Sequence, residues 1–142
     1  MKSLVVLASA AFAVLTVAQM SATNVVGAWE GDSKCVNLAA LPGCKDEHVI
    51  YHITQELDKM KHPSSDTVLV RSDKVVDKKP LVMGYLTFKI NFATFQMVNY
   101  FKTKKAKGAW SFSVKGNTMT GTLTKLPEGV VVRKITLKRV KK

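Results

Sequence analysis

The sequence is poor in acidic residues, and this shortage sets its charge. Ten Asp and Glu stand against 22 Lys and Arg in 142 residues, which gives a formal net charge of +12. Hydrophobic residues make up 46% of the chain, so it is not a disordered basic tail, because such tails are poor in apolar residues. A chain of this length is normally one domain, which excludes an enzyme built from separate cofactor and substrate lobes.

Long apolar segments are also lacking, apart from one at the start. The stretch from Leu4 to Ala18 carries no charge, and the small residues Ala18, Ser21 and Ala22 follow. Its ~15 residues are fewer than the ~20 that a membrane-spanning helix needs. It predicts a signal peptide, residues 1–22, cleaved after Ala18 or Ala22, with an uncleaved anchor as the alternative. The remaining domain, residues 23–142, would be periplasmic or extracellular.

Cysteine is scarce as well. Only Cys35 and Cys44 are present, with eight residues between them. In an exported protein such an isolated pair predicts one disulfide. The alternative is a metal site, but two thiols alone do not complete a tetrahedral zinc shell. We therefore expect a disulfide, no bound metal and no cofactor.

No stretch has a helical period over three turns, whereas apolar and polar residues alternate through most of the chain. The clearest example is the run 82–92, which predicts a long half-buried strand. Turn signals such as Lys115-Gly116-Asn117 separate these runs. The expected strands are 25–35, 47–55, 67–76, 82–92, 94–101, 110–114, 118–124 and 131–138, with a loop over 56–65.

Eight sequential strands with short connections predict an all-β fold. An antiparallel up-and-down meander would expose two strand edges, and closing it into a barrel removes them. An eight-stranded barrel of this size is filled by side chains or holds one small ligand. We predict an eight-stranded antiparallel up-and-down barrel, with a two-sheet sandwich as the alternative.

A short motif lies on the first of these expected strands. Gly27-Ala28-Trp29 begins the first expected strand, and Arg133 is an inward position on the last. This resembles the lipocalin–calycin pattern, which implies that Trp29 and Arg133 pack together and close one barrel end. A buried Arg needs a partner, and stacking on an indole is one solution. With 46–51, Met83-Gly84 and 116–123, the chain more closely resembles uncharacterised exported bacterial proteins with a lipocalin-like (calycin) β-barrel, a resemblance that implies no activity.

Titratable residues are densest at Asp46, Glu47, His48, Tyr51 and His52. On a strand, the rings of His48 and His52 would lie ~13 Å apart, too far to share a metal. There is no HExxH motif, no Gly-x-Ser-x-Gly motif and no glycine-rich phosphate loop. We expect no enzymatic activity, and a small hydrolase or isomerase centred on Glu47, His48 and Tyr51 is the third of three functional hypotheses.

The lysines suggest the first hypothesis. In an up-and-down barrel, alternate connections share one end, so a set of lysines would ring the mouth opposite Trp29. This lysine rim comprises Lys78, Lys79, Lys102, Lys104, Lys105, Lys107 and Lys125. Inward residues would form a cavity wall: Leu86, Phe88, Ile90, Met97, Phe112 and Met119. A cavity with a cationic rim suits a small apolar or amphiphilic anion, such as a fatty acid, unless these residues simply fill the core.

The second hypothesis is a ligand-free barrel that acts as a cationic surface-binding or protein-interaction module. The basic C-terminus, 138–142, would then contact an anionic membrane surface. Nucleic-acid binding is not expected, because the aromatic residues alternate as core positions and do not form an exposed stacking platform. We expect a monomer or weak oligomer.

Overall fold

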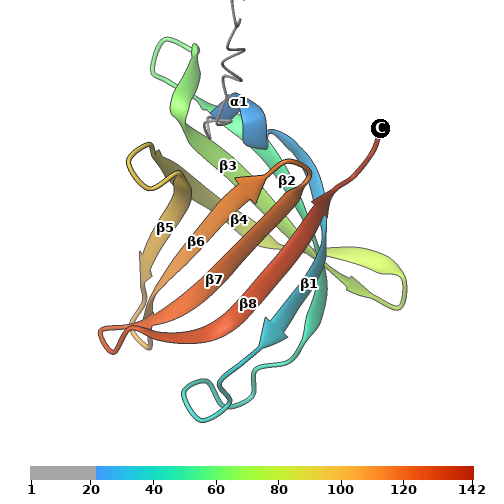
Figure 1. Ribbon diagram of the computed structural model, residues 1–142, viewed down its shortest axis with the longest axis vertical. Coiled ribbons are helices and arrows are strands. Elements are labelled where there is room, and N and C mark those ends of the chain that lie inside the picture. Colours follow the sequence, from blue (N-terminus) through green and yellow to red (C-terminus); the bar gives the residue numbers. More distant parts are fainter. Residues whose placement is uncertain (1–21) are drawn as a thin grey trace, which may run out of the picture.

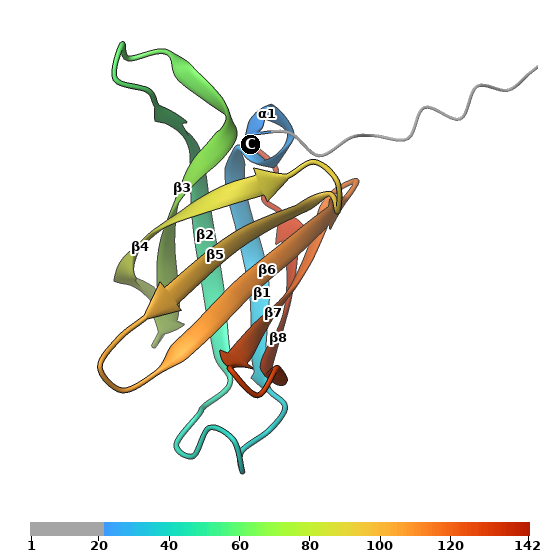
Figure 2. The same cartoon turned by 90° about the vertical axis from the view of Figure 1, so that its left-hand side faces the viewer.

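The computed structural model describes residues 22–142, which form one closed barrel of eight antiparallel strands (Figure 1). A short helix, α1 (Ala22–Val25), precedes the barrel. The strands are β1 (Gly27–Cys35), β2 (Glu47–Leu57), β3 (Pro63–Val76), β4 (Lys79–Asn91), β5 (Gln96–Lys102), β6 (Lys107–Lys115), β7 (Thr118–Leu126) and β8 (Val130–Arg139). Each strand pairs with the next and β8 pairs with β1 (Figure 2). The predicted fold class is confirmed.

The N-terminal prediction stays untested. Residues 1–21 of the expected signal peptide lie outside the described residues, and only Ala22 falls within them. Across residues 22–142, no helix has the length and apolar character that a membrane crossing requires.

Two connections differ from the expected loops because short side chains cap them. The Asp58 carboxylate accepts hydrogen bonds from the backbone N–H groups of Met60 and His62, both at 2.8 Å. This tight turn lets β3 begin at Pro63 and shortens the expected 56–65 loop. A similar turn at Asn91 ends β4, so Phe92 is half exposed instead of facing inward. Such Asx turns compete with the strand ladder.

The core is made by the inward side chains of all eight strands, as the alternation predicts. Aromatic rings meet edge to face at its centre, where Phe112 contacts both Tyr51 and Phe88 at 5.7 Å between ring centroids. Ile53, Met97, Met119, Ile135 and Leu137 are also almost fully buried. These side chains fill the half of the barrel that lies towards α1.

Trp29 and Arg139 close that end of the barrel. Trp29 is fully buried, and its indole N–H donates to the carbonyl of Val25 at 2.8 Å. The Arg139 guanidinium lies over the indole, 4.1 Å from the ring centroid. It also donates to the backbone carbonyls of Val26, at 2.9 Å, and Asn24. The arginine thus joins β8, the indole and the α1 segment into one plug.

The predicted Trp29–Arg133 pair is therefore wrong. In the β1–β8 register, Trp29 lies opposite Arg139, whereas Arg133 lies opposite Cys35 at the other end of β1. The antiparallel direction is the reason, because it brings the end of β8 beside the start of β1. The expected inward orientation of Arg133 is correct, and this side chain points into the open end of the barrel.

Gly27 allows the plug to form. Its φ of +129° lies in a region that side chains with a Cβ rarely adopt. A Cβ there would stand 3.2 Å from Nη1 of Arg139. Both constraints favour glycine at the first position of Gly27-Ala28-Trp29.

The predicted disulfide is present and fixes the β1–β2 loop at the opposite end. Cys35 and Cys44 are bonded, with their Cα atoms 6.0 Å apart. The backbone N–H of Cys35 donates to Asp46 at 2.8 Å, and the Lys125 ammonium donates to the carbonyl of Ala40 at 3.3 Å. The loop is thereby tied both to the end of β1 and to β7.

We predict that Arg139→Ala lowers the free energy of unfolding by about 2 kcal/mol, because it removes a cation–π contact and charged hydrogen bonds. Denaturant unfolding followed by tryptophan fluorescence measures this loss. Lys141→Ala, a change in the exposed tail, is the control and should stay within about 0.5 kcal/mol. Equal effects of the two changes would contradict the assigned role of Arg139.

Candidate functional site

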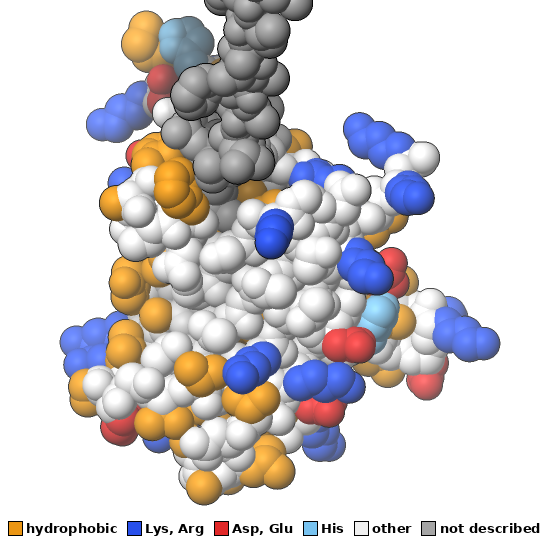
Figure 3. Space-filling view, viewed as in Figure 1, with side chains coloured by type: hydrophobic (Ala, Val, Ile, Leu, Met, Phe, Trp, Pro, Cys, Tyr) orange, Lys and Arg blue, Asp and Glu red, His pale blue; other side chains and the backbone are white. Residues whose placement is uncertain are grey.

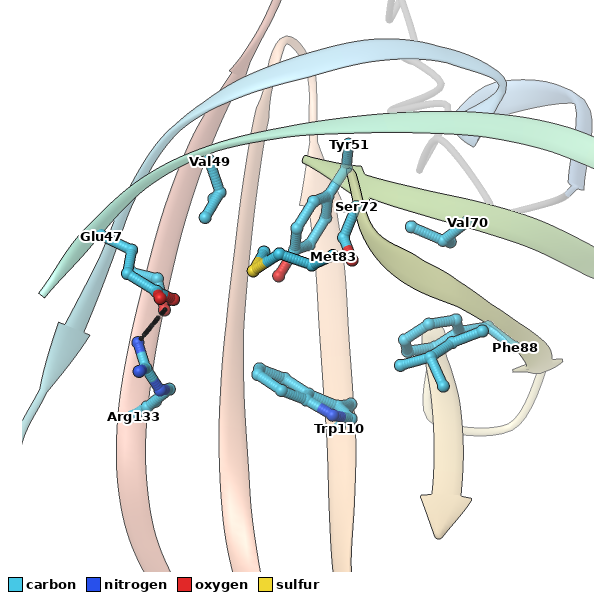
Figure 4. Close-up of a pocket in the computed structure, with 11 residues that line it drawn as sticks. Glu47, Val49, Tyr51, Val70, Ser72, Met83, Phe88, Trp110 and Arg133 are labelled. Atoms are coloured by element: carbon cyan, nitrogen blue, oxygen red, sulfur yellow. Dashed lines mark hydrogen bonds and ion pairs between the residues drawn. The ribbon is translucent and has the colours of Figure 1, made fainter. Parts of the chain in front are cut away.

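A cavity of about 270 Å³ opens at the end of the barrel opposite the Trp29 plug (Figure 4). Its walls come from strands on both sides of the barrel, namely β1, β2, β3, β4, β6 and β8. The residues that line it are Ser33, Glu47, Val49, Tyr51, Val70, Ser72, Met83, Leu86, Phe88, Trp110 and Arg133. Polar and apolar side chains occupy different parts of this wall. One part can form hydrogen bonds, and the other can pack against apolar groups.

Arg133 organises the polar part. Its side chain is only 12% exposed and lies 3.5 Å from the carboxylate of Glu47, as the dashed line in Figure 4 shows. Nη1 also donates to Ser33 Oγ and Nη2 donates to the carbonyl of Lys45, both at 3.0 Å. These bonds compensate for removing the guanidinium from water. They engage Nη1 and Nη2 only, so Nε takes part in none of them.

Tyr51 adds a hydroxyl to the same cavity. Its ring is buried against Phe112, and burial raises the pKa of Tyr51 to about 12. The charge of Arg133 works in the opposite direction, whereas Glu47 raises the pKa further. The hydroxyl therefore stays protonated and can donate a hydrogen bond. Among residues 22–142 we find no hydrogen-bond partner for it.

The rest of the cavity wall is apolar. Val49 and Val70 lie on one side, and Met83, Leu86 and Phe88 of β4 on another. The indole of Trp110 also lines the cavity and stacks on Phe112, with centroids 6.2 Å apart and planes 10° apart. This surface can pack against a hydrocarbon or aromatic group.

The predicted cavity wall is only partly at the cavity. Leu86 and Phe88 line it, but the other four predicted residues do not. Ile90, Met97, Phe112 and Met119 are buried in the core beneath the cavity. For these four residues the alternative interpretation is correct, and they fill the core. The barrel is packed with side chains towards the end that Trp29 closes.

The predicted cavity wall included none of Glu47, Tyr51 and Trp110, and Glu47 and Tyr51 entered only the third hypothesis, as members of a catalytic centre. A signal for Glu47 and Tyr51 was present, because both share the inward phase of Val49 on β2. The alternation could therefore have placed Glu47, Val49 and Tyr51 together on the inner wall at the mouth of the barrel. Arg133 was correctly placed inward but assigned to the wrong end.

The lysine rim lies at the same end as the cavity. Lys78, Lys79, Lys102, Lys104 and Lys105 are exposed at or beside the β3–β4 and β5–β6 turns. Lys107 begins β6, and Lys125 lies near the end of β7. Figure 3 shows Lys and Arg side chains scattered over several parts of the visible face, so they are not confined to this end.

His48 lies on the outside of the barrel, away from the cavity. Its two ring nitrogens lie 3.0 Å from Asp32 Oδ1 and 2.8 Å from Glu30 Oε1. Hydrogen bonds to Asp32 and Glu30 raise the pKa of His48, and the bond to His48 lowers the pKa of Asp32. Glu47 and His48 thus face opposite sides of β2, and the two cannot act together on one substrate.

His52 also points outward, where it joins a separate ion-pair cluster. Its Nε2 lies 3.2 Å from the buried carboxylate of Asp73, which also accepts hydrogen bonds from Arg71 at 3.1 and 3.2 Å. Within the described part of the chain, no group of three or more His, Cys, Asp or Glu residues is arranged to hold a metal.

We predict that Tyr51 stabilises the fold less as the pH rises. Its pKa is about 12 in the folded protein and close to 10 in the unfolded chain, so the folded state favours the neutral phenol. The contribution of Tyr51 to the free energy of unfolding should therefore be fully present below pH ~10. It should fall by about 2–3 kcal/mol by pH ~12. Unfolding free energies of the parent and of Tyr51→Phe, compared across this range, isolate the effect. An unchanging difference would contradict it.

Comparison with known proteins places the fold but no family. No model of a known protein family matches the sequence, and no curated protein matches it either. The structure is similar to the crystal structure of a mutant of the fluorescent protein UnaG, with a TM-score of 0.51. The match covers 84% of this chain and 99% of that chain at 14% sequence identity. At this identity the likeness shows the fold alone, a closed eight-stranded antiparallel barrel.

Proposed function

We propose that this chain is an exported lipocalin-like protein that binds a compact amphiphilic anion of the lipid-acid type at the open end of its barrel. One observation carries the proposal: a cavity joins an apolar wall to a largely shielded arginine and to a tyrosine hydroxyl that has no hydrogen-bond partner within residues 22–142. Binding sites for small molecules typically combine apolar walls with a few polar groups that fix orientation.

The size of the cavity favours a short ligand. Its volume of about 270 Å³ is close to the lower end of the usual range for ligand pockets, ~300–1,000 Å³. The packed core below it leaves no further room for a long chain, because Met97, Phe112 and Met119 are almost fully buried. Each methylene buried in the apolar part would contribute about 0.8 kcal/mol.

Charge favours an anionic head group. Glu47 already balances Arg133, but a guanidinium has five N–H donors, and Nε is outside the contacts described above. The Tyr51 hydroxyl supplies another donor. Lysines at the same end would raise the local concentration of anions. A ligand carboxylate would therefore meet donors inside the cavity and a favourable field outside it.

The two other hypotheses receive less support. A barrel acting only through its cationic surface would not need a cavity with buried polar groups. A hydrolase or isomerase centred on Glu47 and His48 would need the two side chains near one point, and they face opposite sides of β2. We therefore propose a binding protein without catalytic activity.

We predict that decanoate binds to the purified protein and that decyltrimethylammonium, with the same tail, binds about tenfold more weakly or not at all. Isothermal titration calorimetry measures both. The double variant Glu47→Gln/Arg133→Gln, which leaves no unpaired charge, should weaken decanoate binding about tenfold. Lys104→Gln removes one exposed positive charge outside the cavity and is the control. It should change the affinity for decanoate less than about twofold.

Equal affinity for the two amphiphiles, or unchanged decanoate binding in the double variant, would contradict an anion site at Arg133. Native mass spectrometry of the protein purified from its producing cells gives an independent check. It should show a bound acid of low mass that the double variant does not retain.

Export is proposed on two grounds. The disulfide is typical of oxidising compartments, and the first residues have the composition of a signal peptide. Of the two expected cleavage positions, we propose the one after Ala18. Ala22 is fully buried within α1, and a cut after it would place a charged amino terminus beside the buried Val25.

We predict that the exported protein begins at Gln19. Intact-mass measurement and N-terminal sequencing of protein recovered from the periplasm of an expression host test this. A protein that begins at Thr23, or that keeps residue 1, would contradict cleavage after Ala18.

A further inference from the structure

The barrel wall is weakest between β4 and β5. The two strands pair only through Lys89–Val98, Ile90–Met97 and Asn91–Gln96, whereas β4 pairs with β3 from Lys79 to Lys89. Figure 1 shows the two strands meeting at the upper left and then diverging, with β5 descending while β4 runs back towards the β3–β4 turn. The side of β4 that would face β5 thus has no backbone partner from Lys79 to Phe88 within residues 22–142.

Asn99 ends the short ladder. Its side-chain amide donates to the carbonyl of Thr87 at 2.8 Å. If the β4–β5 register continued, Thr87 would lie opposite Tyr100. The side chain of Asn99 therefore takes the place of a backbone donor from β5 at the carbonyl of Thr87. The other amide atom, Asn99 Oδ1, is buried and has no partner in the described part of the chain. Beyond this point neither of the two facing edges has a backbone partner among residues 22–142.

The bare edge is also apolar. No charged residue occurs between Lys79 and Lys89. Leu81, Val82 and Tyr85 are 50%, 57% and 61% exposed, although strand edges are normally blunted by charges, bulges or proline. Pro80 protects the start of this edge, and a one-residue bulge at Met83 interrupts it, so the regular part of the bare edge lies over 84–88. The facing strand adds Tyr100, which is 75% exposed.

We propose that the edge of β4 binds an extended segment of another protein, with alternating apolar residues at its centre and carboxylates at its ends. The segment would add a strand to β4 by backbone hydrogen bonds, a known mode of peptide recognition. Its apolar side chains would cover Val82 and Tyr85. Its acidic ends would lie near Lys79 and Lys89, the two charges that bound the apolar run.

A lipid bilayer fits this edge less well. Hydrocarbon could cover the apolar side chains, but it cannot satisfy the unpaired N–H and C=O groups of β4, and open sheet edges do not face lipid. A second copy of the chain also fits less well. Gly84 lies midway between Lys79 and Lys89, so a symmetric antiparallel pairing about it would oppose lysine to lysine. Like charges directly opposite each other are destabilising.

The inference stands apart from the proposed ligand. Met83, Leu86 and Phe88 of the same strand line the cavity, so an added strand would lie beside these residues. The binding of a strand to β4 requires nothing in the cavity, and the experiment below uses the protein without added amphiphile.

The probe is a nine-residue peptide in which valine and threonine alternate and two glutamates stand at each end. Fluorescence anisotropy of the labelled peptide should show saturable binding, and amide NMR signals of 81–88 should shift. Replacing the glutamates with lysines should weaken binding about tenfold. Methylating alternate backbone nitrogens on the pairing edge should do the same, because it removes the hydrogen-bond donors.

Tyr85→Glu tests the location. It should weaken binding of the acidic peptide about tenfold through like-charge repulsion. Met60→Glu is the matched control, because Met60 is 76% exposed in the β2–β3 loop at the other end of the barrel. It should bind the peptide as the parent does. Both positions are exposed, and circular dichroism establishes that both variants fold.

Three results would overturn the proposal. The first is equal peptide binding by Tyr85→Glu and Met60→Glu, or NMR shifts away from β4. The second is a peptide-free dimer in sedimentation that Tyr85→Glu dissociates, which would assign the edge to a second copy. The third is binding to phosphatidylglycerol vesicles that Tyr85→Glu abolishes, with no peptide binding, which would assign it to a membrane.

Discussion

The pairing of β1 with β8 decides what each end of the barrel does. It closes the sheet, and its register brings two inward arginines of β8 to opposite ends of β1. Arg139 lies on Trp29 and ties α1 to the barrel. Arg133 lies in the mouth with Glu47 and Ser33. A guanidinium shielded from water needs partners wherever it lies. Arg139 finds them in the indole and in the α1 segment, whereas Arg133 finds them in the wall of the cavity.

The strands, the barrel and the inward positions could be predicted from the sequence. They depend on the alternation of apolar and polar residues, which can be recognised within each short segment. The alternation from β1 to β8 predicted the strands, the barrel and the inward position of Arg133. The spacing of Cys35 and Cys44 predicted the disulfide that the structure contains. The pairing of Trp29 failed because it depends on register. Strand direction alone already favoured the arginine at the end of β8.

Other features depend on three-dimensional contacts that no periodicity records. The Asp58 and Asn91 turns shift strand ends by a few residues, because side-chain oxygens compete for backbone N–H groups. The end of the β4–β5 ladder depends on one amide of Asn99 reaching Thr87. Both strands keep an ordinary alternating pattern on either side of that contact, so the sequence carries no mark of where their pairing stops.

The cavity and the bare edge have one cause. If β5 continued to pair with β4 beyond Lys89, the wall would lie closed beside Leu86 and Phe88, and their side chains would meet others from β5. Because the strands diverge instead, these residues and Met83 line open space, and the backbone of β4 loses its neighbour on that side. Space for a ligand and an unsatisfied strand edge therefore arise together.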